Sequence, residues 1–304
     1  MSELPSAIGN AQSQAVFLRE NEVFLREYPE LAGLETKIFI RALSQPPEAE
    51  LEAIRKLPED SAAVIEFENK LSSEPIVFYL GRIAADDFGE ILVLAGNGYG
   101  FGAHKIVRGM FERVVTAIYI ARNPTEARVF AEQSAIDKHK LWERTVAAFP
   151  EMAKGASEED LQFLRESSDA ARKKLKASVC PKCKQSLPDS PWTRKGIDAM
   201  AKEVDETLFR LYGQFYLEGT AQSHANSLGM ERRLVRSDSG GWTYKETSGD
   251  EGRFAVNLGH ILLLKMLRLQ NEFFGLGLDT EIEKREDAYR SIWKPDAMTS
   301  SAQP

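Results

Sequence analysis

The chain has 304 residues, of which 43% are hydrophobic and 28% are charged, as in ordinary soluble globular proteins. Its net charge of −7 and pI of about 5.4 exclude a uniformly basic, nucleic-acid-binding surface. No apolar run reaches about 18 residues, and the first residues lack the basic flank and apolar stretch of a signal peptide. Together with only two cysteines, these features predict a cytoplasmic protein without a membrane-spanning segment.

The N-terminal part of the chain is predicted to be helical. Residues 12–44 predict one long helix, in which VFLRE occurs at 16–20 and again at 23–27. A repeat of seven returns the same side chains to one face, which packs within its own domain or forms a short seam between copies. Pro46 and Pro47 end this helix. Short helices are predicted at 48–56 and 60–72, and Pro75 opens a further, mostly helical stretch that reaches about residue 95.

A glycine-rich turn at 96–102 leads into the next helix, which carries three polar residues in line. His104, Arg108 and Glu112 are spaced at i, i+4 and i+8, so they share one side of the helix. The apolar stripe beside them consists of Val107, Met110, Phe111, Val114, Ile118 and Ala121. Charges at the edge of a core need partners. We therefore expect Arg108 to bind an anion with Glu112 positioning it, or the pair to be an ordinary surface ion pair.

A second polar line is predicted on a later long helix. Tyr216, Thr220 and His224 again have the spacing i, i+4 and i+8, on a face away from the apolar stripe of the same helix. If the two polar lines face each other, they enclose an arginine, a carboxylate, a phenol, a hydroxyl and an imidazole. Such a set can bind a phosphate group or perform acid–base chemistry.

The remaining chain completes an all-α prediction. The elements expected after residue 123 are helices at 124–149, 158–177, 193–228, 252–275 and 279–293, with one small β-hairpin near 231–249. Short connections favour a multi-helix antiparallel bundle. The predicted domains are an N-terminal helical subdomain at 1–75, a main helical domain at 76–293 and a disordered tail at 294–304.

The two cysteines are a candidate metal site. Cys180 and Cys183 form a CxxC pair next to proline and lysine, which resembles half of a zinc ribbon. A closed zinc site needs four ligands, so a second copy, His139 or His104 would have to complete it. Two ordinary loop thiols are the simpler interpretation, and we expect neither a metal nor another cofactor.

The order of the polar motifs resembles a bacterial family of all-helical proteins that is labelled a domain of unknown function. Its members carry an R-x-x-x-E helix and a later Y-x-x-x-S-x-x-x-H helix. Here Arg108 and Glu112 match the first motif, and Tyr216, Thr220 and His224 match the second, with threonine in place of serine. The resemblance covers about residues 80–275, and implies a shared polar site without an established activity.

A second pattern resembles the HEPN-type helical nucleases. These use an R-x(4–6)-H motif for metal-independent RNA cleavage, in which the arginine holds phosphate and the histidine lies near the attacking hydroxyl. Arg253 and His260 have the six-residue spacing, although Phe254 replaces the usual polar residue after the arginine. This resemblance implies an endoribonuclease in stress or phage defence.

Three hypotheses about function follow. In the first, the protein binds a small anion, a nucleotide or an RNA phosphate, with Arg108, Glu112 and His224 at the centre of the site and Tyr216, Thr220 and His104 around it. In the second, it cleaves RNA with His224 or His260. In the third, the polar residues only pair with one another, and surfaces such as the helix at 16–27 mediate homo-oligomerisation.

Overall fold

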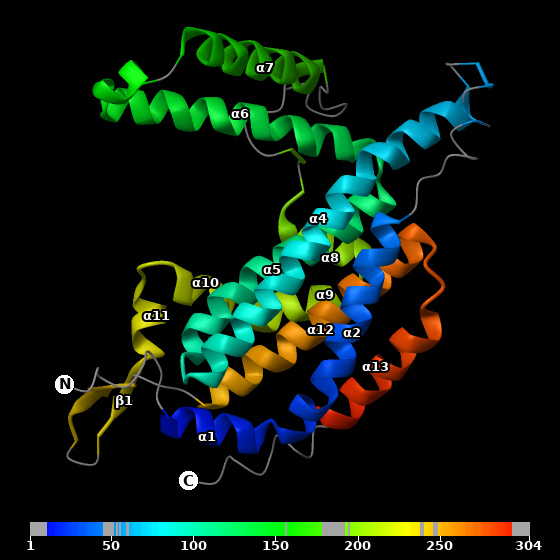
Figure 1. The fold of residues 1–304 in the computed structure, drawn as a ribbon. Helices are drawn as coiled ribbons and strands as arrows, with labels where there is room; N and C mark the ends of the chain where they lie inside the picture. Colours follow the sequence, from blue (N-terminus) through cyan, green and yellow to red (C-terminus); the bar gives the residue numbers. More distant parts are fainter. Residues whose placement is uncertain are drawn as a thin grey trace, which may run out of the picture. The chain divides into compact units, whose positions relative to one another are not determined.

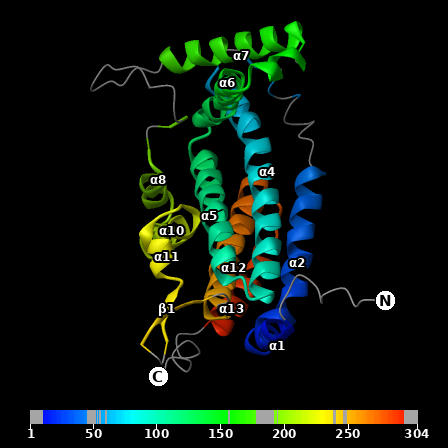
Figure 2. The ribbon, with the colours of Figure 1, turned by 90° about the vertical axis from the view of Figure 1, so that its left-hand side faces the viewer.

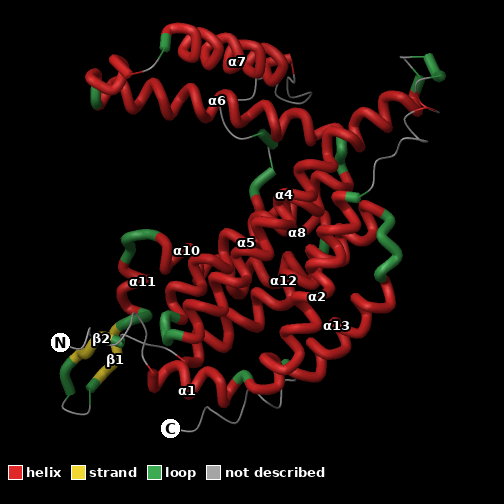
Figure 3. Tube along the Cα trace, in the orientation of Figure 1, coloured by secondary structure: helices red, strands yellow, loops and turns green. Residues whose placement is uncertain are grey.

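The structure is a computed structural model, which describes residues 11–44, 52, 54, 56–58, 61–155, 157–177, 192–193, 195–237, 240–245 and 249–293. Helices dominate this part of the chain, and its one sheet has two strands (Figures 1 and 3). The predicted all-α class with a small hairpin is therefore confirmed. Within the described residues, no helix combines the length and apolar character needed to cross a membrane.

The chain forms two compact units that interleave along the sequence. Unit 1 contains residues 1–50, 77–119 and 200–304, and unit 2 contains residues 51–76 and 120–199. The long helices that connect them run on from one unit into the other. The predicted division instead placed a boundary at residue 75, and it remains a prediction. The predicted tail at 294–304 lies outside the described residues.

Unit 1 is built around one apolar helix. Its helices are α1 (Ala11–Glu20), α2 (Glu22–Leu43), most of α4 (Ala62–Gly96), most of α5 (Gly100–Arg122), α9 (Glu206–Leu211), α10 (Leu217–Ser223), α11 (Ser227–Glu231), α12 (Gly249–Phe274) and α13 (Asp279–Ile292). Helix α8 (Ile197–Val204) leads into the unit. The central helix is α12, with α2, α4, α5 and α13 around it (Figures 1 and 2). Gly259 allows it to lie close to Phe88 of α4.

The predicted single helix at 12–44 is wrong in one respect. The chain breaks at Asn21, between α1 and α2, and the Asn21 side chain donates back to the carbonyl of Phe17 at 3.0 Å. The two VFLRE copies therefore lie on different helices. A seven-residue repeat implies a continuous seam only when the helix is continuous.

The predicted single helix at 193–228 is also divided. Asp205 caps α9 by accepting from the Leu208 amide at 2.8 Å. A π-helical turn, η2 (Tyr212–Tyr216), then joins α9 to α10. Helix α10 ends at Ser223, and Asn226 caps α11. Aspartate and asparagine are strong helix starters, so these internal caps end one helix and begin the next.

The predicted hairpin is present. Strands β1 (Leu234–Arg236) and β2 (Trp242–Tyr244) pair antiparallel, with Leu234 opposite Tyr244. Just before β1, the guanidinium of Arg233 lies 4.7 Å from the centre of the Phe101 ring, and it donates to the Tyr244 hydroxyl at 2.7 Å. One arginine thus ties the hairpin to the first turn of α5.

Unit 2 contains a pair of packed helices. Helix α6 (Thr125–Ala148) is followed by the 3-10 helix η1 (Pro150–Gly155), and α7 (Glu158–Ala177) packs against α6. Ser157 starts α7, because its hydroxyl accepts from the Asp160 amide at 3.0 Å. The buried side chains between the two helices include Ile136 of α6 and Ala171 of α7.

Candidate functional site: the Arg108 cluster

The structure brings part of the two predicted polar lines together. Arg108 and Glu112 lie on α5, and Tyr216 ends the π-helical turn η2. We call these three residues the Arg108 cluster. All three belong to unit 1, and each is partly exposed.

A guanidinium and a hydroxyl donor of the Arg108 cluster converge on one carboxylate oxygen. Arg108 Nη2 lies 3.0 Å from Glu112 Oε1, and the Tyr216 hydroxyl donates to the same oxygen at 2.6 Å. Arg108 Nη2 also donates to Tyr216 Oη at 3.3 Å. A hydrogen bond from a hydroxyl to a carboxylate is about twice as strong as one between neutral groups, whereas Arg108 and Glu112 form an ion pair. The three side chains thus form a closed, charge-assisted triangle.

Aromatic packing holds the arginine in place. The Arg108 guanidinium carbon lies 5.2 Å from the centre of the Tyr216 ring, close enough for a cation–π contact. Tyr216 stacks in turn on Tyr212, with ring centres 4.9 Å apart. Burial, followed by the bond to Glu112, raises the pKa of Tyr216 above its usual value. The phenol therefore stays protonated at neutral pH and acts as a donor.

Gly219 makes this arrangement possible, and sequence reasoning did not identify it. A Cβ atom at this position would lie 2.8 Å from the His104 carbonyl oxygen and 2.9 Å from the Arg108 Cβ. Such distances are too short for real Cβ atoms. Glycine therefore allows α10 to touch the backbone of α5. The sequence signal was a glycine immediately before Thr220, within a predicted helix.

The remaining members of the second polar line lie differently from what we expected. The Thr220 hydroxyl donates to the Tyr216 carbonyl oxygen at 2.9 Å, within its own helical segment. His224 is exposed at the C-cap of α10, where its extended backbone leaves the helix. Helix α10 ends at Ser223, before His224, so the helical spacing on which the expected line of three depended stops after Thr220.

His104 lies deeper than Arg108 on the same side of α5. It is 1% exposed, and its Nε2 is 2.9 Å from Oε2 of Glu251 on α12. This distance is not accompanied by the geometry of a well-directed hydrogen bond, and Nδ1 has no hydrogen-bond partner among the described residues. The contact with His104 lowers the pKa of Glu251 more than burial raises it. His104 therefore links α5 to α12 inside the bundle.

His260 has the surroundings of a core histidine. It is 3% exposed, and its Nδ1 accepts from the indole of Trp293 at 3.1 Å. Burial lowers the pKa of His260 to about 4, so it is neutral at physiological pH. Arg253, its predicted motif partner, lies over the Trp293 ring at 5.9 Å. The pair therefore lacks the accessible histidine that RNA cleavage requires.

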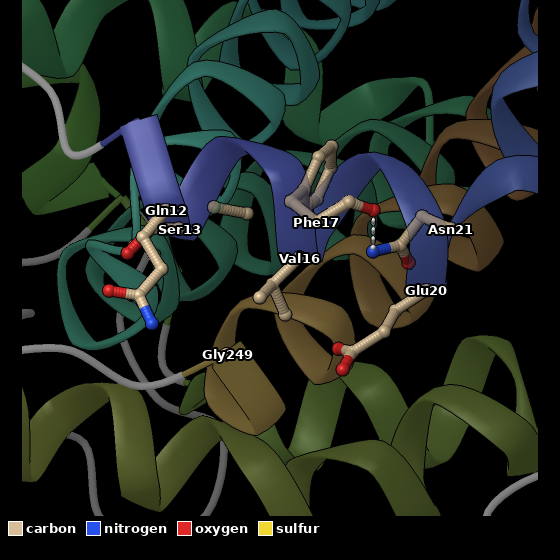
Figure 4. Close-up of a pocket in the computed structure, with 9 residues that line it drawn as sticks. Gln12, Ser13, Val16, Phe17, Glu20, Asn21 and Gly249 are labelled. Carbon is tan, nitrogen blue, oxygen red and sulfur yellow. Dashed lines mark hydrogen bonds between the residues drawn. The ribbon is translucent and has the colours of Figure 1, made fainter.

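The hollow beside the Arg108 cluster is small. A small void of about 10 Å³ lies beside Arg108 and Tyr216, and this is room for about one water molecule. A larger hollow of about 260 Å³ lies between α1 and the start of α12, lined by Phe17, Glu20 and Asn21 among others (Figure 4). An anion at the cluster would therefore bind at its exposed side.

The described residues contain no group of three or more metal-binding side chains. The predicted pair Cys180 and Cys183 lies outside the described residues. Of the two histidines proposed to complete a zinc site, His104 pairs with Glu251 in unit 1. His139 is buried on α6 in unit 2, with Nδ1 3.7 Å from Glu143 Oε2.

Comparison with known proteins adds one decisive match. A family of unknown function, DUF5677, matches residues 76–241, which is more than half of the chain. The chain belongs to DUF5677. This confirms the resemblance to a family of unknown function, whereas the similarity to HEPN nucleases is not shown. No curated protein and no solved structure matches the chain.

The matched segment contains the complete Arg108 cluster. Arg108 and Glu112 lie in its first half and Tyr216 near its end, together with Gly219. Arg253 and His260 lie beyond the end of the DUF5677 match. The cluster is therefore part of the DUF5677 segment, and the nuclease-like pair is not.

Proposed function

We propose that the protein binds a small anion at the Arg108 cluster, with Arg108 as the anchoring cation. The observation that carries this proposal is the convergence of Arg108 and Tyr216 on one oxygen of Glu112. A guanidinium and a phenol that converge on one anionic oxygen form the kind of site that recognises a carboxylate or phosphate. Glu112 occupies that position as an internal anion in the absence of a ligand.

Exchange of Glu112 for a ligand is the expected mode of binding. The Glu112 side chain is 40% exposed, so it can turn towards solvent. An incoming phosphate oxygen would then accept from Arg108 and Tyr216. The stacked Tyr212 and Tyr216 rings hold the guanidinium in position, so that little side-chain entropy is lost when the ligand binds. A nucleotide or an RNA phosphate is a more specific candidate for this ligand.

Calorimetric titration tests the proposal with inorganic phosphate, a nucleoside monophosphate and a short single-stranded RNA as probes. Arg108→Ala should weaken binding by about tenfold or more, because it removes the charge-assisted bonds. Glu112→Gln should strengthen binding several-fold, because the competing charge is gone while an oxygen remains. Arg210→Ala is the matched control, since Arg210 forms an exposed ion pair with Glu206 elsewhere. It should leave binding unchanged.

Arg108→Ala and Glu112→Gln are expected to change the binding affinity in opposite directions, which distinguishes ligand binding from a purely structural role. If the cluster only pins α5 to η2, none of the probes will bind to the wild type or to folded Glu112→Gln, and the proposal fails. The RNA probe also tests the nuclease alternative. Cleavage in EDTA that disappears in His224→Ala would make the protein a metal-independent endoribonuclease with an exposed histidine, and not an anion-binding module.

A further inference from the structure

Helix α7 exposes a regular seam on the side that does not face α6. Ser168 and Ala171 are buried in the pair of helices. The exposed residues of the outer seam repeat at intervals of four and three. They are Glu159, Phe163, Glu166, Ala170 and Lys173. This is the spacing with which one helix presents a stripe to another helix.

Packing against α6 does not account for the presence of Phe163 in the outer seam. Its side chain is 72% exposed on a helix whose other outward residues are mostly charged or small. The acidic first turn of α7 has an ordinary explanation, because negative charge stabilises the start of a helix. A single exposed apolar side chain is common on protein surfaces. Here the ring lies in a regular stripe between charged residues, as in a contact between two helices.

When two copies of the outer seam lie antiparallel, their charges are complementary. Helix α7 begins with Glu158, Glu159 and Asp160, and its second half carries Arg172 and Lys173. Neither Glu159 nor Lys173 has an ion-pair partner among the described residues. If two α7 helices lie antiparallel, Glu159 of each copy faces Lys173 of the other. Phe163 then fills the space over Ala170, which places a large side chain opposite a small one.

We propose that the outer seam of α7 binds a second copy of this chain, antiparallel and related by a two-fold axis. A two-fold contact uses the same patch on both copies, so the patch must be complementary to itself. The axis passes near Glu166, which therefore approaches its own copy. This like-charge approach weakens the contact slightly. The interface is small, so the dimer forms reversibly and its population rises with protein concentration.

Sedimentation velocity over a range of concentrations tests the dimer. The wild type should shift from the chain mass of 34.0 kDa towards twice that mass as concentration rises. Phe163→Asp should remain monomeric at every concentration. Val93→Asp is the control, because Val93 is an exposed apolar residue of α4, outside the seam. It should dimerise like the wild type. Circular dichroism should show that both variants keep their helical content.

A charge exchange tests the antiparallel register. Glu159→Lys and Lys173→Glu should each weaken dimerisation at least tenfold, because each places like charges opposite one another. The double variant E159K/K173E should recover the wild-type dissociation constant, because the pairs are restored with reversed sign. Glu166→Gln should tighten the dimer. A wild type that remains monomeric throughout, a Val93→Asp variant that cannot dimerise, or a double variant without recovery would overturn the proposal.

Discussion

Two clusters of polar side chains in unit 1 lie in opposite surroundings. The Arg108 cluster is charged and partly exposed, and its members pair with one another. The His260 cluster is neutral and buried. His260 lies among the rings of Phe24, Phe88 and Tyr289, and accepts from Trp293. An exposed charged cluster can exchange an internal partner for a ligand. A buried neutral cluster instead stabilises the folded state, and removing any of its members lowers the free energy of unfolding.

The largest expected effect comes from removing the buried histidine. His260→Ala should lower the free energy of unfolding by about 3 kcal/mol, because it leaves a cavity and an unpaired Trp293 indole N–H. His224→Ala, at the exposed end of α10, should change it by less than about 0.5 kcal/mol. Urea denaturation followed by circular dichroism measures both. Equal effects of the two substitutions would contradict the contrast between a buried and an exposed histidine.

The His260 cluster should also make the free energy of unfolding depend on pH. The pKa of His260 is lowered to about 4 in the folded protein, from 6.5. The unfolded chain therefore binds this proton first as the pH falls. The stability associated with neutral His260 is present above pH 6.5 and is lost as the pH falls to about 4, by about 3 kcal/mol in total.

The pH dependence needs a difference measurement, because Asp87 acts in the opposite direction. Burial raises the pKa of Asp87 to about 6, despite the nearby charge of Arg113, so its protonation favours the folded state as the pH falls below 6. His260→Gln keeps an acceptor for Trp293 and does not titrate. The stability of the wild type relative to His260→Gln should fall between pH 6.5 and 4. A difference that stays constant would show that His260 is not held neutral.

A smaller effect is expected at the Arg108 cluster. Gly219→Ala should lower the free energy of unfolding by about 2 kcal/mol, because the new Cβ overlaps the backbone of α5. Gly213→Ala is the matched control, since a Cβ added there would point into open space, with no packed atom within 4 Å. It should be neutral or slightly stabilising. Thermal unfolding of the two variants compares them directly, and equal melting temperatures would mean that α10 moves away from α5 without cost.

The prediction of the fold succeeded where local signals agree with packing. Apolar positions predicted the long helices α5 and α12, and a glycine pair between β-prone residues predicted the hairpin. Separate helices were expected on either side of Pro75, but α4 continues through it from Ala62 to Gly96. The prediction also failed where a single residue divides a continuous pattern. Asn21 and Asp205 end one helix and start another, although apolar residues recur on both sides. Periodicity averages over many residues, so it does not resolve a one-residue break.

The sequence by itself determined that Arg108 and Glu112 share a helix face, because the i, i+4 spacing fixes this in any α-helix. It also supplied Tyr216 as a candidate partner. Only the tertiary structure decided that Tyr216 reaches them while His224 lies exposed at a helix end, because a π-turn and the contact at Gly219 set the position of α10. It also decided that His260 is buried. Burial depends on neighbours from distant parts of the chain, which helical spacing does not encode.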